Sequence, residues 1–153
     1  GSLKAAEPKI KKKANGLVAN LRSAEEIASC VISRVNNSQP KRMIYIAPWS
    51  WDQFQDHIFY ATVQGAILAL TESMAWHTAN RGITVNCVVP GYIGTARPSS
   101  LQKQFREKIK ASIPSGHLGE IRDVVEAIFF LIGDSAKYIT GQNLIADGGW
   151  TCI

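Results

Sequence analysis

The chain has 153 residues, of which 46% are hydrophobic and 19% charged, the balance of an ordinary soluble globular protein with one core. No apolar run approaches the roughly 20 residues needed to span a bilayer, and no apolar secretory signal follows the first residues. These features exclude a membrane-spanning class of protein and favour a single domain.

The net charge of +5 is concentrated near the N-terminus. We expect residues 1–15 to form a basic, flexible lead-in, in which Gly1 and Ser2 are a tag remnant, and residues 16–153 to form the folded domain. A lysine run can meet an acidic or nucleic-acid partner, but it more often forms a solvated tail. No aromatic residue is interleaved for base stacking, so nucleic-acid binding is not expected. The run comprises Lys9, Lys11, Lys12 and Lys13.

Apolar periodicity predicts helices alternating with short buried strands. Strands separated by helices imply right-handed crossovers and a parallel sheet. The expected fold is therefore α/β, with about three parallel strands and flanking helices. The predicted helices are 16–37, 59–80, 101–112 and 120–133, and the predicted strands are 41–47, 83–89 and 143–146.

The three cysteines are an odd number, and none is spaced as a metal knuckle or a redox pair. Cys30 and Cys87 fall in apolar patterns, which predicts buried free thiols. Free thiols indicate a reducing compartment, so we expect a cytoplasmic protein. His77 and His117 have no partners at metal-ligand spacing, and no metal site is predicted.

Four motifs in order resemble the C-terminal half of a classical short-chain dehydrogenase/reductase, of the 3-oxoacyl reductase type. Asn20 precedes the first strand at the distance of that family's helical Asn, and Tyr60 occupies the position of its catalytic Tyr. The other two motifs are Asn86 with the run Pro90-Gly91-Tyr92-Ile93-Gly94-Thr95, and Tyr138–Gln142 with Asp147-Gly148-Gly149. The resemblance implies a partial Rossmann-like fold.

The sequence departs from the family pattern at the positions that matter most for catalysis. The family's Lys, which lowers the pKa of the Tyr and binds the nicotinamide ribose, corresponds to Gln64. The substrate-orienting Ser corresponds to Pro48, which has no hydroxyl, although Ser50 lies two residues further on. No Gly-rich phosphate-binding turn occurs, so we expect the N-terminal mononucleotide-binding half to be lacking.

By resemblance, Tyr60 and Asn20 are therefore predicted to be relics of a catalytic set. The predicted cofactor-binding residues are Pro90, Gly91, Ile93 and Thr95.

Two functional hypotheses follow, and a third interpretation is that the sequence is a fragment. The first is a non-catalytic subunit that acts by association, as a homodimer or with an intact reductase-family subunit, and that binds no cofactor in isolation. Its interface would use helices 16–37 and 59–80, which commonly form the family's dimer, and the unpaired edge of strand 41–47. The alternative is an oxidoreductase that uses NAD or NADP, active once a partner supplies the cofactor-binding half. The sequence is also compatible with a piece of a longer polypeptide.

Overall fold

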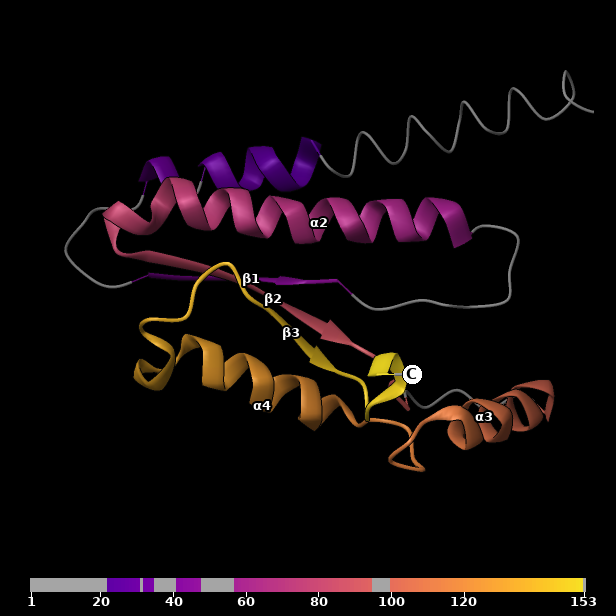
Figure 1. Cartoon of the computed structure of the whole chain (residues 1–153). Coiled ribbons are helices and arrows are strands. Elements are labelled where there is room, and N and C mark those ends of the chain that lie inside the picture. The colour runs from indigo at the N-terminus through magenta and orange to yellow at the C-terminus, as the bar shows by residue number, and fades with distance from the viewer. Residues whose placement is uncertain (1–21, 31, 35–40, 48–56, 95–99, 153) are drawn as a thin grey trace, which may run out of the picture.

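The computed structural model describes residues 22–30, 32–34, 41–47, 57–94 and 100–152 (Figure 1). The basic lead-in and four of the predicted positions, Asn20, Pro48, Ser50 and Thr95, lie outside the described residues. Within the described ranges every predicted helix and strand is present, with ends that shift by one or two residues.

The chain alternates between strands and helices, as predicted. Residues 22–30 and 32–34 are helical. The elements that follow are β1 (Lys41–Ile46), α2 (His57–Thr78), β2 (Ile83–Pro90), α3 (Ser100–Ser112), α4 (Ile121–Ile132) and β3 (Asn143–Ala146), with short 3₁₀ turns at Ala79–Arg81, Asp134–Ala136 and Trp150–Cys152.

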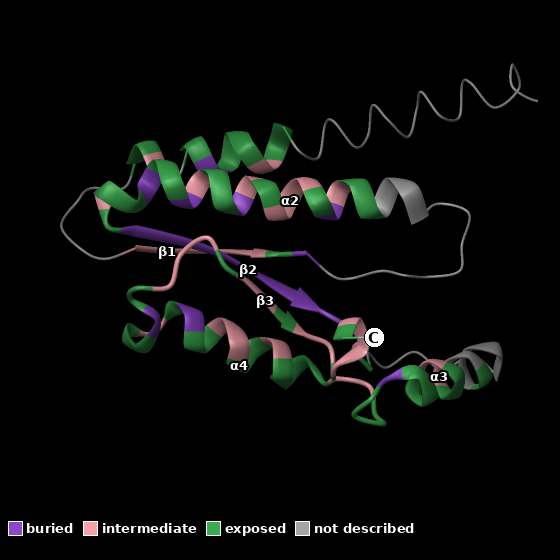
Figure 2. Ribbon diagram, viewed as in Figure 1, coloured by how far each residue is buried: buried purple, intermediate pink, exposed green. Residues whose placement is uncertain are grey.

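The strands form one parallel sheet in the order β1-β2-β3. Lys41 lies opposite Ile83 in the first pair, and Cys87 lies opposite Asn143 in the second. All eight residues of β2 are buried, whereas β1 and β3 have no buried residue (Figure 2). The sheet therefore depends on its central strand, which agrees with the predicted partial Rossmann-like fold.

Helices cover both faces of the sheet. The helix before β1 and α2 lie on one face, α4 lies on the other, and α3 lies beyond the carboxyl ends of the strands (Figure 1). On the α2 face, Ala75 packs with Ile83 and Val85. On the α4 face, Val88 packs with Leu131 and Ala136. Burying each Val or Leu side chain stabilises the fold by about 1.5–3 kcal/mol.

The segment before β3 is joined to β2 by a buried amide. Asn86 is fully buried; its Nδ2 donates to the Ile139 carbonyl at 2.9 Å, and its Oδ1 accepts from the Gln142 N–H at 3.0 Å. The Gly141 N–H also donates to the Val85 carbonyl at 2.7 Å. Asn86, one of the residues that carries the resemblance, thus has a structural role in the sheet.

The cysteine prediction is half right. Cys87 is buried in β2, where burial raises the pKa of its thiol. The prediction of a buried Cys30 is wrong, because this residue lies on the exposed side of its helix, where Arg34 Nη1 donates to its sulfur at 2.6 Å. The helical periodicity was correct, but the face that it assigned to Cys30 was not. Among the described residues, no helix is both long and apolar enough to cross a membrane.

Candidate active site at the carboxyl end of the sheet

The loops that follow β2 and β3 meet at one edge of the sheet. The Gly91 N–H donates to the Ala146 carbonyl at 3.0 Å, so pairing between the strands continues to the last residue of β3. In open parallel α/β sheets, ligands bind outside the carboxyl ends of the strands. This edge is therefore where the fold places a ligand site.

Gly91 is required by a close approach of two backbones. A Cβ atom at this position would lie 2.6 Å from Cβ and 2.7 Å from Cα of Asp147. Contacts this short involve backbone and cannot be relieved by rotating a flexible side chain. Gly91 thus allows the two loops to pack directly against each other.

The loop after Gly91 is held in an extended conformation by Gly119. Ile93 forms an isolated parallel bridge with Gly119, in which the Gly94 N–H donates to the Gly119 carbonyl at 2.8 Å and the Gly119 N–H donates to the Tyr92 carbonyl at 2.9 Å. In a parallel bridge of this kind, the N–H and C=O of Ile93 itself point away from Gly119. No partner within the described chain is assigned to them.

Asp147 organises the turn on the other side of this edge. Its Oδ1 accepts from the Gly149 N–H at 2.9 Å, and its Oδ2 accepts from the Thr151 N–H at 2.8 Å. The turn also requires positive φ angles, 67° at Gly148 and 87° at Gly149. Burial acts to raise the pKa of the carboxyl group, but the hydrogen bonds from Thr151, Gly149 and Trp150 outweigh it and lower the pKa below its ordinary value.

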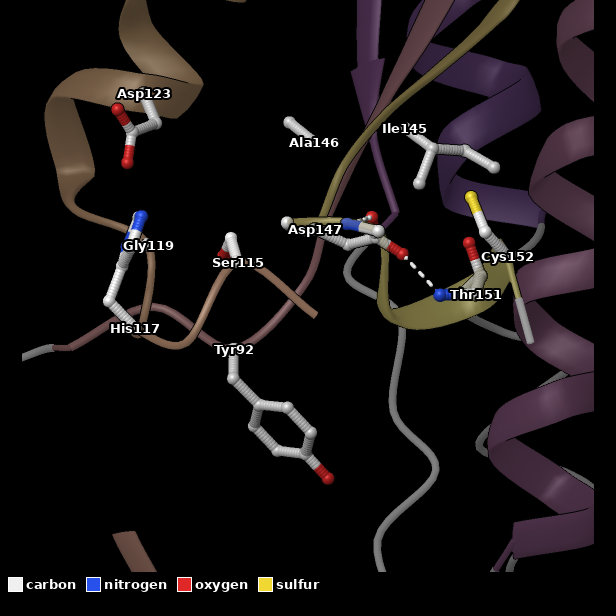
Figure 3. Close-up of a pocket in the computed structure, with 12 residues that line it drawn as sticks. Tyr92, Ser115, His117, Gly119, Asp123, Ile145, Ala146, Asp147, Thr151 and Cys152 are labelled. Carbon is white, nitrogen blue, oxygen red and sulfur yellow. Dashed lines mark hydrogen bonds between the residues drawn. The ribbon is translucent and has the colours of Figure 1, made fainter. Parts of the chain in front are cut away.

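A cavity of about 550 Å³ opens between these loops. Ser115, His117, Gly119 and Asp123 lie on one side of it, Thr151 and Cys152 lie on the other, and Asp147 lies between them (Figure 3). Tyr92 borders the cavity, and its ring packs edge-on against Trp150 with centroids 4.7 Å apart. A cavity lined by hydroxyl, imidazole and carboxylate groups can bind a polar small molecule.

Of the predicted site residues, the structure brings Pro90, Gly91 and Ile93 together at this edge. Tyr60 lies in the first turn of α2, but its side chain is outside the described atoms, as are Asn20, Pro48 and Thr95. Groups of three or more potential metal ligands are absent from the described part of the chain, where the structure offers no candidate metal site.

The side chain of Gln64 is buried and hydrogen-bonded within the fold rather than free to act on a ligand. It is 8% exposed, and its Nε2 donates to the Ala47 carbonyl, just beyond β1, at a long distance of 3.4 Å. The amide therefore links α2 to the end of β1. It carries no charge that could lower the pKa of a neighbouring phenol.

Sequence reasoning missed the cavity-lining residues Ser115 and His117, and it missed the capping role of Asp147. The signal for Asp147 was present, since Asp followed by two glycines is typical of a turn in which the carboxylate accepts backbone hydrogen bonds. No local pattern indicated that the segment containing Ser115 would pack here. The Ser115 N–H donates to the carbonyl of Gly148, which lies 33 residues later in the chain, at 3.1 Å.

A family model described as enoyl-(acyl carrier protein) reductase matches residues 6–151, nearly the whole chain. The chain belongs to the short-chain dehydrogenase/reductase family. This confirms the family that the four motifs predicted, and with it the Rossmann-like nature of the three-stranded sheet.

Curated reductases are similar to about 60% of this chain. The 3-oxoacyl-(acyl-carrier-protein) reductase FabG of Vibrio cholerae is 40% identical over 94 residues, which cover 61% of this chain and 38% of the relative. FabG of Escherichia coli is 40% identical over 90 residues, covering 59% of this chain and 37% of the relative. The match thus spans well under half the length of these relatives.

A solved structure from Beutenbergia cavernae, with NADP bound at low occupancy and proposed to be an NAD(P)-dependent gluconate 5-dehydrogenase, superimposes with a TM-score of 0.66 at 34% identity. The superposition covers 74% of this chain and 47% of the Beutenbergia cavernae chain. A proposed short-chain alcohol dehydrogenase from Sinorhizobium meliloti gives the same TM-score at 25% identity, with 76% and 47% coverage. Both agree with a partial family fold.

Substituting Gly91 by Ala should destabilise the chain by about 1–3 kcal/mol, because the added methyl group collides with the backbone of Asp147. Gly65→Ala is the matched control. Gly65 lies inside α2, and no atom lies within 4 Å of the position that an added methyl group would take, so the same change should stabilise by about 0.5–1 kcal/mol. Urea denaturation of both variants measures the difference, and equal effects would contradict the close approach.

Replacing Asp147 by Asn should remove part of the acid sensitivity of the fold. Because the folded-state pKa lies below the ordinary value of 3.8, the carboxylate contributes stability that is fully present above about pH 4 and is lost as the pH falls through the folded-state value. The free energy of unfolding should depend less on pH below 4 in Asp147→Asn than in the parent. Parallel curves for the two proteins in urea titrations between pH 2 and 5 would refute this role.

Proposed function

We propose that this chain provides the nicotinamide-side part of an NAD(P)-dependent oxidoreductase that reduces a carbonyl compound of the 3-oxoacyl type. The similarity to FabG reductases at 40% identity supports the reaction class. The arrangement of Gly91, Ile93 and Asp147 at the carboxyl edge supports the location of the site. Activity would require the phosphate-binding half of the fold, supplied by a partner or by further polypeptide.

The observation that carries this proposal is the orientation of Ile93. Its outward N–H and C=O form one donor and one acceptor a short distance apart. A primary carboxamide carries the complementary pair, an acceptor oxygen and a donor NH₂ group. The nicotinamide ring carries such a carboxamide and, when bound, supplies the hydride. Gly119 holds the Ile93 backbone in this orientation before any ligand arrives, so little ordering is needed on binding.

The proton-transfer side of the site matches this function less well. Tyr60 would donate a proton to the carbonyl oxygen, but a free phenol has a pKa of about 10. Gln64 is neutral and is already used by the Ala47 carbonyl, so it neither lowers that pKa nor presents an ammonium group to a ribose. The expected enzyme is therefore slow.

The experiment that tests this function restores the missing charge. The chain is mixed with the separately expressed N-terminal half of a FabG-type reductase, and NADPH oxidation is followed with a 3-oxoacyl thioester. Gln64→Lys should raise the rate by about 10²-fold, the usual scale of one positioned acid–base group. Tyr60→Phe should abolish the activity in both backgrounds.

Ser73→Lys is the control for added charge, since Ser73 is an exposed residue elsewhere on α2. It should leave the rate unchanged. If Gln64→Lys gives no gain although the mixture binds NADPH, the proposed catalytic role of this helix is wrong.

A non-catalytic, associating subunit is the second candidate, and an exposed apolar stripe on α4 favours it. Ile121 is 63% and Phe129 60% exposed, and Val125 lies between them at helical spacing. Apolar side chains grouped in this way are typical of an association surface, for which a second copy or an intact family member is the proposed occupant.

On this second hypothesis, Phe129→Glu should weaken self-association at least tenfold, because it places a charge in the centre of the apolar stripe. Sedimentation velocity over a concentration series measures the fraction of the chain that is present as the 16.7 kDa monomer and the fraction in larger species. Gln104→Glu adds the same charge at an exposed site on α3 and should leave association unchanged. A parent chain that stays monomeric throughout and binds no family member would exclude this function.

A further inference from the structure

A second cavity lies at the amino-terminal end of the strands, opposite the candidate active site at their carboxyl end. It has a volume of about 510 Å³ and opens between the amino-terminal ends of β1 and β2 and the segment that follows α4. The polar side chains that line it are Arg42, Thr84, Asp134, Lys137, Tyr138 and Thr140. None of the proposed catalytic or nicotinamide-binding residues borders it.

Two neighbouring side chains in its lining contain buried polar atoms that lack partners. Arg42 and Thr84 lie opposite each other in the register of β1 and β2, on the sheet face that α4 covers. Arg42 Nε and Thr84 Oγ1 are both buried, and neither has a hydrogen-bond partner within the described chain. Thr84 as a whole is only 8% exposed. Buried polar atoms without partners are rare in folded proteins, and two side by side call for a common explanation.

The remaining groups in the lining determine what ligand would suit these atoms. Thr140 is already engaged, since its Oγ1 accepts from the Val85 N–H at 3.0 Å. Arg42 Nη1 donates to the Lys41 carbonyl at 3.2 Å, which leaves other donors of its guanidinium group unassigned. Arg42 and Lys137 supply two positive charges against the single carboxylate of Asp134. The excess is therefore in hydrogen-bond donors and in positive charge.

We propose that this cavity binds a small oxyanion, of the phosphate or carboxylate class, through Arg42 and Thr84, with Lys137 adding charge at its mouth. A planar guanidinium group pairs well with two oxygens of such an anion, and a hydroxyl group supplies one further donor. Both atoms are closed to solvent in the unliganded chain, so the Arg42 and Thr84 side chains would turn toward the anion on binding and gain their missing partners from it. The site is separate from the proposed oxidoreductase chemistry and does not depend on it.

The test measures the melting temperature of the full chain in potassium phosphate or potassium acetate, each compared with potassium chloride at equal ionic strength. At saturation, phosphate or acetate should raise Tm by about 5 °C relative to chloride. A response to phosphate alone or to acetate alone identifies the class of anion, and either supports the site. Equal melting temperatures in all three salts would overturn the proposal.

Variants distinguish a built site from a general salt effect. Arg42→Met should abolish the response to the anion, whereas Lys110→Gln, which removes an exposed charge on α3, should retain it. Thr84→Val should raise Tm in chloride, because it removes an unpartnered buried hydroxyl, and should reduce the response to the anion. These two opposite effects cannot both arise from a loss of folding. A response that is unchanged in Arg42→Met and Thr84→Val would refute the assignment.

Discussion

The burial of β2 is the constraint on which the rest of the structure depends. Every residue of this strand is buried, and its two faces supply both halves of the core. The flanking strands are partly exposed; they pair with β2 and add Met43, Ile44 and Leu144 to the margin of the core. A strand that is buried on both faces must satisfy all of its backbone groups internally. The loops at its two ends are thus fixed by pairing, and both cavities described here lie at those ends.

The same constraint explains why glycines are needed at the carboxyl edge. Pairing continues past β2 to the Gly91 N–H, which brings the following loop against Asp147 at a distance that excludes any Cβ atom. The Asp147 carboxylate then closes its own turn by accepting two backbone hydrogen bonds. The result is a rigid rim on which Ile93 presents its backbone groups. Rigidity at this position reduces the cost of ordering a ligand, in line with a site supported by secondary structure rather than by loose loops.

The fold could be predicted because its signals are local. Apolar runs located all three strands and helical periodicity located the helices. Gly82, a residue type that favours helix ends, follows the turn at Ala79–Arg81 and adopts a left-handed φ of 69°. The site could be predicted only in part. Pro90, Gly91 and Ile93 were identified through resemblance, whereas Ser115 and His117 reach the cavity through contacts between distant segments that no local pattern encodes. Cys30 shows a related limit, since periodicity indicates a helix but does not determine which side chains a neighbour covers.

Gln64 determines how far the chemistry of the family can extend to this chain. Its side chain is buried, yet the hydrogen bond that it donates to the Ala47 carbonyl is long, at 3.4 Å, and therefore weak. A lysine at the same position would have to keep its ammonium group solvated or paired, which a bound ribose and a phenolate would both assist. A neutral amide makes no such demand and tolerates burial with one partner. On the proposed function, Gln64 therefore lacks the charge needed for fast proton transfer, while its amide still links α2 to the end of β1. For this reason, stability measurements alone cannot separate a slow enzyme from a non-catalytic subunit, whereas restoring the charge at this one position can.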